Sequence, residues 1–371
     1  MKIFLSIIIL VGFIELLFLS IWYLSFRMSA LFEIKSRRSL FFIISISIVS
    51  SLVAMLSGTR LTNNIIGILN ILGGYVFSFF MFLTFILLLL HLLQLIMKLP
   101  QKWVCRSALL LSFFITIAGA IQANHFVVNE IEIQLNGLKQ DVLIMHISDI
   151  HIGHHRGRDY LARIVAETNC LKPDMVLING DMLDSNVALI PGVLSPLSDF
   201  EAPVYYVGGN HEEYMETERA LKMIEQQGVR ILHNEVVNTH GIYLIGLDYM
   251  KPDNETFDIH ASKDERVIKD EILKLSIGKD QPSVLMHHSP LGVKYISKKG
   301  IDLMLSGHTH AGQMFPNTLF AAIFFTYLKG LYEAGNTKVF VSSGAGTFGA
   351  RIRLNTSNEL DLIRLKPEAD R

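Results

Sequence analysis

Cysteine is scarce in this chain, which has two, Cys105 and Cys170, among 371 residues. Two lone cysteines can build neither a thiolate metal site nor a disulfide framework. The sequence also lacks internal repeats and low-complexity segments. A fold that depends on sulfur chemistry or on repetition is therefore not expected.

Acidic residues are nearly missing from the first third of the chain. Residues 1–122 contain nine Lys and Arg residues against two Asp and Glu residues, a balance of +7. Because the whole chain carries a net charge of −1, residues 123–371 carry −8. A part this acidic is a poor general binder of polyanions, so no nucleic-acid partner is expected. Its carboxylates could instead be neutralised in part by bound cations.

The first third contains four long apolar runs, which cover residues 3–26, 39–57, 64–97 and 104–120. The first two are each long enough to cross a bilayer as a helix, and the fourth is a shorter candidate that carries Arg106 near its start. The third run is longer than one span needs, and Asn64, Asn70 and the Gly73-Gly74 pair indicate that its membrane part begins near Ile71. A cleaved signal peptide is the alternative for the first run, but its apolar part is too long and three more runs follow. We therefore predict an all-α transmembrane region with about four helices in residues 1–122.

Basic residues in short loops predict the orientation, because Lys and Arg collect on the cytoplasmic side. The N-terminus and the second loop contribute only Lys2 and Arg60. The first and third loops contribute Arg27, Lys35, Arg37, Arg38, Lys98, Lys102 and Arg106. With four spans, this distribution predicts a multi-pass protein of the cell membrane with everything after about residue 123 on the outer side. One span more or fewer would reverse that side.

Short apolar strands alternate with helix-like stretches in residues 123–371, which we predict to form a second domain. Strands are expected at 141–149, 174–181 and 203–210, and helices at 158–171 and 215–228. Paired strands are expected at 230–249, and further strands in "PSVLMHHSP", "IDLMLSGHTH", "TKVFVSSGAG" and "ELDLIRL". This number of strands favours a layered α/β sandwich over a single doubly wound sheet.

Polar residues follow five of the predicted strands, where folds of this class usually place their chemistry. In order the stretches are "DIH", "GDMLD", "GGNHE", "HHSP" and "GHTH". Carboxylates with imidazoles and no thiolate suit Mn, Fe or Zn, and the number of ligands exceeds what one ion takes. Each stretch alone is readily explained as a polar turn, but five in succession are hard to obtain as unrelated turns. Two metal ions are the economical interpretation.

These five stretches resemble the calcineurin-like metallophosphoesterases, whose pattern reads D-x-H, G-D-x-x-D, G-N-H-[ED], a later H, and G-H-x-H. The resemblance covers about residues 142–365, and it is closest to the branch in which transmembrane spans precede the phosphoesterase domain. It implies a four-layer α-β-β-α sandwich over residues 123–371. It also implies an enzyme, a metal-dependent phosphoric ester hydrolase.

The resemblance further implies two divalent metal ions and their ligands. One ion would be held by Asp149, His151, Asp181 and His310, and the second by Asp181, Asn210, His288 and His308. Asp181 would bridge the two ions. In the branch with transmembrane spans the fourth stretch reads H-x-P, which selects His288 over His287. Two such ions lower the pKa of a shared water, and the resulting hydroxide would attack phosphorus.

A catalytic pair is implied beside the ligands. His211 would protonate the leaving oxygen or stabilise the transition state, and Asp184 would orient His211. Arg351 and Arg353 are candidates for a contact with the phosphate. The sequence does not separate a monoesterase from a diesterase or a pyrophosphatase, and it does not predict the oligomeric state.

The apolar segment at residues 315–332 follows the last stretch directly and bears on the substrate. It is too short and interrupted to span a membrane, so it is either buried core or dips into the bilayer interface. The second interpretation motivates the hypothesis of a lipid phosphate or a diphosphate-linked lipid as substrate. The alternatives are a hydrolase of soluble phosphomonoesters or nucleotides with the spans as a tether, and a non-enzymatic membrane sensor.

Overall fold

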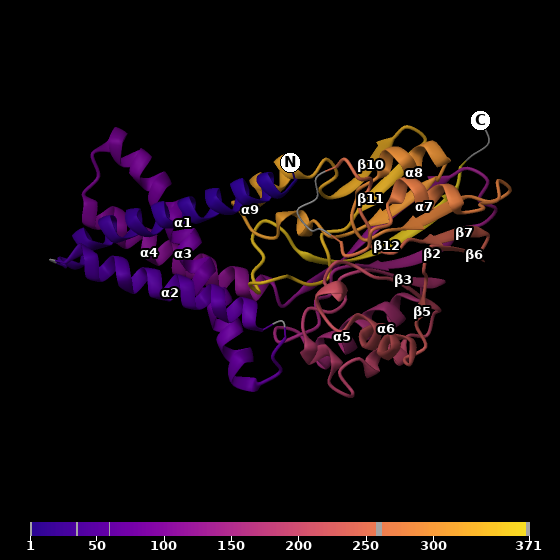
Figure 1. Cartoon of the computed structure of the whole chain (residues 1–371), viewed down its shortest axis with the longest axis horizontal. Helices are drawn as coiled ribbons and strands as arrows, with labels where there is room; N and C mark the ends of the chain where they lie inside the picture. Colours follow the sequence, from indigo (N-terminus) through magenta and orange to yellow (C-terminus); the bar gives the residue numbers. More distant parts are fainter. Residues whose placement is uncertain (1, 35, 59, 257–261, 369–371) are drawn as a thin grey trace. The chain divides into compact units, whose positions relative to one another are not determined.

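The computed structural model describes residues 2–34, 36–58, 60–256 and 262–368. Within them the chain forms two compact units (Figure 1). One consists of Met1–Gly58 and Asn63–Gln122 with Gly349–Ile352, and the other of Thr59–Thr62, Ala123–Phe348 and Arg353–Arg371. Lys35, which contributed to the predicted orientation, lies outside the described residues.

The first unit contains four helices that are long and apolar enough to cross a membrane, as predicted. They are α1 (Lys2–Phe32), α2 (Arg37–Ser57), α3 (Asn64–Met97) and α4 (Gln101–Gln122). Their apolar side chains meet in a common core that includes Leu24, Ile44, Leu87 and Ala108. Many outward-facing side chains are apolar and exposed, as expected for a surface that faces lipid.

Helix α3 is continuous and starts at Asn64, ahead of the expected start of its membrane part near Ile71. The Asn63 side chain caps it by accepting a hydrogen bond from the Ile65 backbone N–H. Asn70 lies inside the helix, and its amide donates to the carbonyl oxygens of Ala54 and Met55 in α2. A polar side chain that is satisfied by a neighbouring helix is compatible with an apolar bundle.

Arg27, which the sequence placed in the first loop, belongs instead to α1. Its guanidinium is buried and donates a hydrogen bond of 2.8 Å to Gln94 Oε1 in α3. A charged side chain inside an apolar bundle usually pairs with a polar group of a neighbouring helix, as Arg27 does here. The basic residues of that connection are therefore fewer than predicted.

The second unit is built on two six-stranded sheets within the described residues (Figure 1). The first sheet runs in the order β1-β12-β2-β3-β4-β5 and the second in the order β10-β11-β9-β8-β7-β6. The first contains β1 (Phe126–Leu135), β2 (Val142–Ile147), β3 (Met175–Asn179), β4 (Val204–Val207), β5 (Arg230–Ile231) and β12 (Asn358–Pro367). The second contains β6 (Glu235–Thr239), β7 (Ile242–Gly246), β8 (Ser283–Met286), β9 (Leu303–Ser306), β10 (Gly330–Ala334) and β11 (Thr337–Val341).

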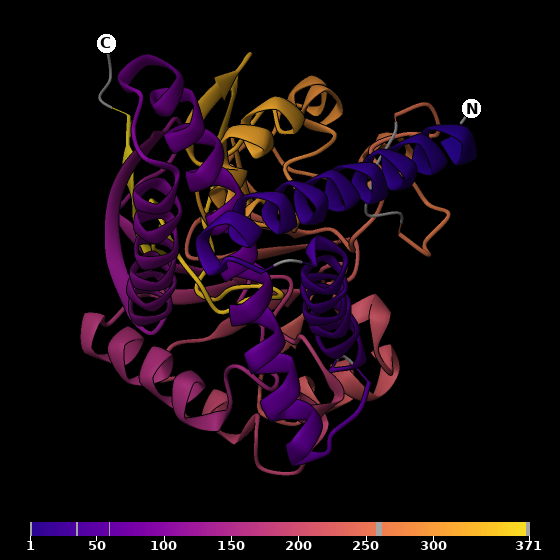
Figure 2. The same ribbon diagram turned by 90° about the vertical axis from the view of Figure 1, so that its left-hand side faces the viewer.

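Helices cover the outer face of each sheet and complete the four-layer α-β-β-α sandwich that the resemblance implies (Figure 2). Helices α5 (Arg158–Leu171) and α6 (Thr217–Glu225) pack on the first sheet. Helices α7 (Ile268–Lys274) and α8 (Val293–Lys299) pack on the second. The predicted fold class is therefore confirmed.

Strand residues alternate between two apolar layers, which is why the central strands read as continuous apolar runs. In β3, Val176 and Ile178 face α5 and α6, whereas Leu177 faces the second sheet. In β8, Val284 faces the first sheet and Leu285 faces α7 and α8. Burial on both faces fixes the register of each strand, and with it the position of the polar residues that follow.

The carboxyl ends of five strands carry all the predicted metal ligands and the predicted catalytic pair, His211 and Asp184. Strands β2, β3 and β4 are neighbouring and parallel in the first sheet, and β8 and β9 are neighbouring and parallel in the second. Parallel neighbours end at the same edge of a sheet, so the polar stretches that follow them are brought together.

Candidate metal centre

The predicted metal ligands sit on tight turns with unusual backbone conformations. Asp149, His151, Asp181, His308 and His310 all have positive φ, between 48° and 71°. Residues other than glycine adopt this region rarely and at an energetic cost, and such residues cluster at functional sites. The turns direct five donor side chains inward instead of along the strand.

The first group of donors comes from the turn after β2 and the turn after β9. His151 Nε2 lies 3.1 Å from His310 Nε2, and Asp149 Oδ1 lies 3.3 Å from His310 Nε2. Asp149 is fixed by the Ser148 hydroxyl at 2.6 Å and by the His308 backbone N–H at 3.0 Å, both of which donate to Oδ2. The ligand atoms of Asp149, His151 and His310 all lie within 4.8 Å of one another, as a single cation requires.

The second group joins both sheets. His288 Nε2 lies 3.1 Å from Asp181 Oδ2 and 3.2 Å from His308 Nδ1. The other ring nitrogen of His288 donates to the carbonyl oxygen of Asn179 at 2.9 Å, which leaves Nε2 as the atom that faces Asp181. Asn210 is buried, and no donor among the described residues contacts its Oδ1 atom.

Asp181 stands between the two groups. Its Oδ2 atom lies 4.0 Å from His151 Nε2 of the first group and 3.1 Å from His288 Nε2 of the second. Its Oδ1 atom accepts a hydrogen bond of 2.9 Å from the His211 backbone N–H. Burial by itself would raise the pKa of this carboxyl, but the nearby His288 and His211 side chains lower the pKa well below its usual range.

His287 and His288 occupy different surroundings, although both are buried. His287 Nδ1 donates to the Ser289 carbonyl oxygen at 2.7 Å, and its ring stacks on Tyr249. Burial lowers the pKa of His287 to about 4, which keeps the ring neutral. Of these two histidines, only His288 belongs to a group of candidate metal ligands among the described residues, and the choice of His288 as the ligand stays a prediction.

Asp184 contacts two histidines, one more than the sequence indicated. Its Oδ1 atom lies 3.2 Å from His211 Nδ1 and 3.3 Å from His151 Nδ1. A carboxylate on the far nitrogen of a metal-binding histidine fixes the ring and strengthens the ligand. Asp184 is therefore placed to orient both the candidate ligand His151 and the candidate catalytic residue His211.

His211 lies beside the donors and is partly exposed, unlike most of them. Burial by itself would lower the pKa of His211, but the Asp181 charge and the hydrogen bond to Asp184 raise it to about 9. Its Nε2 atom lies 3.9 Å from Asp181 Oδ2. A protonated imidazole at this position can donate a proton to an oxygen bound between the two groups.

Glu212 organises the turns around the site and was given no role from the sequence. This buried carboxylate accepts hydrogen bonds from the backbone N–H groups of Gly209 at 2.8 Å, Leu183 at 3.0 Å and Asp181 at 3.1 Å. Gly209 leaves no space for a side chain, because a Cβ atom there would lie 2.2 Å from Asp181 Oδ1. The turns after β3 and β4 are thus locked together through one carboxylate.

We expect Glu212→Ala to destabilise this unit strongly. The change leaves three buried N–H groups without their acceptor, at about 1–3 kcal/mol each. A loss of about 3 kcal/mol corresponds to a fall of roughly 6–12 °C in the thermal midpoint of a domain of this size. Thermal unfolding of the full-length protein in detergent measures this, with Glu218→Ala on the exposed side of α6 as the control. Equal midpoints for the two variants would contradict the role of Glu212.

Arg353 does not face a substrate, in contrast to the expectation of a phosphate contact. Its side chain is fully buried. The guanidinium donates to the carbonyl oxygens of Ser343 and Gly346, both at 2.6 Å, and to that of His310 at 2.9 Å. Arg353 therefore ties the loop after β11 to the turn that carries His310. The phosphate contact predicted for Arg351 stays a prediction.

The donors fit divalent cations. Two pairs of imidazole nitrogens approach to 3.1 and 3.2 Å, and each pair lies beside the carboxyl group of an aspartate. The unpartnered Asn210 Oδ1 atom adds a neutral oxygen donor on the second side. This mixture of oxygen and nitrogen donors without sulfur suits Mn, Fe or Zn.

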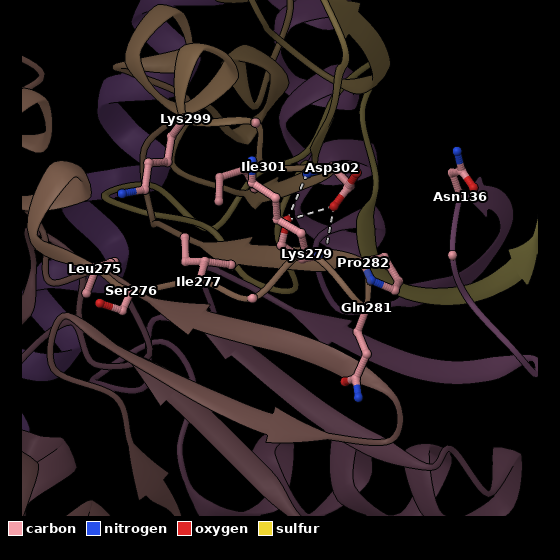
Figure 3. A pocket seen from close by; sticks show the side chains of 14 residues that line it. Asn136, Leu275, Ser276, Ile277, Lys279, Gln281, Pro282, Lys299, Ile301 and Asp302 are labelled. Carbon is pink, nitrogen blue, oxygen red and sulfur yellow. Dashed lines mark hydrogen bonds between the residues drawn. The ribbon is translucent and has the colours of Figure 1, made fainter.

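A cavity of about 860 Å³ lies away from this site (Figure 3). Its lining comes from residues 136–137, 275–279, 281–283 and 299–302, which lie before β2, before and at the start of β8, and before β9. It is therefore at the amino ends of the strands, and none of the predicted site residues lines it. The candidate metal centre is therefore located by the metal-binding side chains that meet at the carboxyl ends of the strands, and not by this cavity.

Comparison with known proteins identifies a domain within the second unit. The family model described as calcineurin-like phosphoesterase matches residues 142–312. An uncharacterized metallophosphoesterase of Helicobacter pylori is 36% identical over 65% of this chain and 64% of its own length. A Danio rerio protein described as a transmembrane protein with metallophosphoesterase domain is 32% identical over 62% of this chain and 54% of its own. The chain thus spans less than two thirds of the length of these relatives.

One solved structure, a dimetal phosphatase from Danio rerio, covers 56% of this chain and 88% of its own at 12% identity and a TM-score of 0.34. So distant a likeness bears on neither activity nor substrate. The family match spans all five polar stretches found in the sequence. Residues 142–312 thus match a calcineurin-like metallophosphoesterase domain, and the relatives that resemble this part of the chain are described as metallophosphoesterases.

Proposed function

We propose that this protein is a membrane-anchored phosphoesterase that hydrolyses a phosphoester or pyrophosphate bond with two divalent cations. The transmembrane region would be residues 1–122 and the catalytic domain residues 123–371. The position of Asp181 Oδ2 carries the proposal, because this atom lies within 4.0 Å of a histidine nitrogen from each group of donors. A carboxylate between two clusters of imidazoles is what a bridging ligand requires.

Each cation would have four protein ligands. Asp149, His151, Asp181 and His310 would hold the first, and Asp181, Asn210, His288 and His308 the second. When bound, two such cations neutralise phosphoryl oxygens and lower the pKa of a water molecule between them. These ligands bind Mn, Fe or Zn, so the identity of the bound ions depends on which metals are available to the protein.

His211 would donate a proton to the leaving oxygen, and Asp184 would orient His211. The partly exposed His211 ring holds a proton because Asp181 and Asp184 lie within 3.9 and 3.2 Å of its nitrogens. Donating that proton to the departing oxygen avoids the release of an alkoxide. A non-enzymatic sensor needs no such group, so the presence of His211 favours catalysis over binding alone.

A substrate panel tests the activity directly. The full-length protein in detergent would be supplied with Mn²⁺ and offered a phosphomonoester, a phosphodiester and a nucleoside diphosphate. We expect hydrolysis of at least one class, its loss on treatment with a chelator, and its recovery when Mn²⁺ is restored. Metal-loaded protein that hydrolyses none of them would contradict the proposal.

We also propose that the catalytic domain lies on the outer side of the cell membrane. Arg37, Arg38 and Lys102 remain at the connections between α1 and α2 and between α3 and α4, whereas Arg60 alone lies at the connection between α2 and α3. Basic connections stay on the cytoplasmic side. A reporter enzyme that is active only outside the cytoplasm, fused after residue 371, should therefore be active. A silent reporter on a stably expressed fusion would place the domain inside.

A further inference from the structure

Helix α9 (Asn317–Phe324, labelled in Figure 1) exposes a large apolar face. None of its residues is buried, and Leu319, Phe320, Ile323 and Phe324 are 56%, 56%, 78% and 74% exposed. These positions repeat with helical spacing and form one face, which we call the α9 face. Residues 317–324 are thus not buried in the core, which was the first interpretation of this segment.

The α9 face is a concentration of apolar surface, not scattered exposure. Ten large hydrophobic side chains are exposed among the described residues after Ala123, and four of them belong to this eight-residue helix. Single exposed apolar residues are normal, whereas a contiguous patch indicates a surface that is covered in use. The stretch from Gln313 to Leu328 contains no charged residue, so it offers no electrostatic recognition of a soluble partner.

The helix is fixed against the candidate metal centre at both ends. Before it, Gly312 packs so closely that a Cβ atom there would lie 2.6 Å from Thr318 Cα and 3.0 Å from Ala321 Cβ. After it, the Phe325 ring lies 5.8 Å from the His308 ring in an edge-to-face contact. Whatever covers the α9 face is therefore held next to His308.

Aromatic side chains also border the site itself. Phe348 is 49% exposed and its ring lies 5.2 Å from the His310 ring. Tyr214 is exposed as well and its ring lies 5.3 Å from the His211 ring. A small hydrophilic phosphate gains nothing from such a border, but the apolar part of a lipid does.

The occupant that fits the α9 face is the bilayer to which the chain is already attached. Only residues 123–125 connect α4 with β1, and a connection of this length spans at most about 13 Å. The domain is thus confined near the membrane that α1 to α4 are suited to cross. An uncharged helix with one apolar face lies in the interface between headgroups and acyl chains.

We propose that the α9 face inserts into the surface of this bilayer and that the substrate is a membrane lipid with a phosphate monoester or diphosphate headgroup. The proposal rests on the phosphoesterase function proposed above. The reaction consumes one water: a bond forms between phosphorus and the water oxygen, and the bond between phosphorus and the leaving oxygen breaks. One proton of the water goes to the leaving oxygen, and the hydroxyl that remains stays on phosphorus. The lipid product stays in the membrane and the phosphate is released into water.

Spin labels test the membrane contact without any reference to activity. In the full-length Cys170→Ser protein in phosphatidylcholine vesicles, a nitroxide at Ile323→Cys is compared with one at Leu273→Cys, a 68% exposed position on α7. We expect the label at position 323 to be less accessible to a water-soluble nickel chelate, and more accessible to oxygen, than the label at position 273. Equal exposure to the nickel chelate at both positions would overturn insertion.

Kinetics test the substrate class. The Phe320→Ser, Ile323→Ser double variant is compared with Leu273→Ser on a diacylglycerol phosphate and a polyisoprenyl diphosphate in vesicles, and on a soluble aryl phosphate. We expect hydrolysis of at least one lipid by the wild type, a loss of at least about tenfold in the double variant, and a rate on the soluble ester within about twofold of the wild type. Leu273→Ser should leave all the rates unchanged.

The outcomes separate this inference from the proposed function. Hydrolysis of the soluble ester without hydrolysis of either lipid, or equal losses on both kinds of substrate, would overturn the lipid substrate and leave the phosphoesterase function standing. No hydrolysis of any substrate by the metal-loaded wild type would overturn the proposed function itself. The spin-label comparison still decides in that case whether α9 contacts the bilayer.

Discussion

Asp181→Asn is expected to lower the rate of hydrolysis by roughly a thousandfold and to reduce the bound metal by at least one ion per chain. Asp181 Oδ2 is the atom that both groups of donors approach, and an amide in its place supplies a weaker, neutral ligand. The fold should survive, because the amide oxygen of the substituted side chain can still accept the hydrogen bond that the His211 backbone N–H donates to Oδ1. Steady-state kinetics and elemental analysis on the same preparation measure the two losses.

The matched control for this change is Asp270→Asn, which alters an exposed carboxylate on α7. It should leave both the metal content and the rate at wild-type values. Asp181→Asn protein that keeps two ions and full activity would show that Asp181 does not bridge them. A variant that loses the metals and also unfolds is recognised by its thermal midpoint, and the comparison then moves to Asp181→Glu, which retains the charge.

His211→Ala is expected to keep the metals and to lower turnover by about 10²–10⁴-fold. The side chain contacts Asp184 and lies near Asp181, but the two groups of donors are complete without it. The loss should depend on the leaving group. It should be large for alkyl phosphates, whose oxygen needs a proton to depart, and small for activated aryl phosphates, which depart without one.

His240→Ala, at an exposed position in the turn between β6 and β7, serves as the control and should have wild-type kinetics. An equal loss on alkyl and aryl esters would assign His211 to stabilising charge in the transition state instead of protonating the leaving oxygen. Undiminished turnover with bound metal would remove His211 from the catalytic machinery altogether.

The number of apolar strands in the sequence predicted a layered α/β sandwich, and the resemblance of the five polar stretches to a known family implied its four layers. Strands such as Met175–Asn179 are buried on both faces, so their apolar runs end abruptly where a polar turn begins. The turns that carry Asp181 and His308 follow such runs directly. The structure brings five of these turns to one edge because β2, β3 and β4, like β8 and β9, run parallel.

Contacts between distant segments were beyond the reach of sequence patterns. Strand β1 was not predicted, and its partner β12 lies more than 200 residues away in the chain. Nothing in the local sequence shows that Arg353 is buried or that it donates to the carbonyl oxygen of His310. The second contact of Asp184, to His151, likewise depends on how two turns meet.

The composition of the α9 segment does not predict whether its apolar residues are buried or exposed. Its apolar residues are equally compatible with a core helix and with an interfacial one, since both have the same spacing. The close packing of Gly312 on Thr318 and Ala321 turns Phe320 and Ile323 outward. Exposure is a property of the tertiary fold, and here it carries the inference about substrate.

Metal stoichiometry tests the central claim most directly. The full-length protein would be purified in detergent, incubated with Mn²⁺, freed of loosely bound ions and measured by elemental analysis. Two coordinated ions are expected per chain, because Asp181 Oδ2 lies within 4.0 Å of a histidine nitrogen from each of the two groups of donors described above. A folded wild-type protein that binds one ion or none under these conditions would contradict a dinuclear centre.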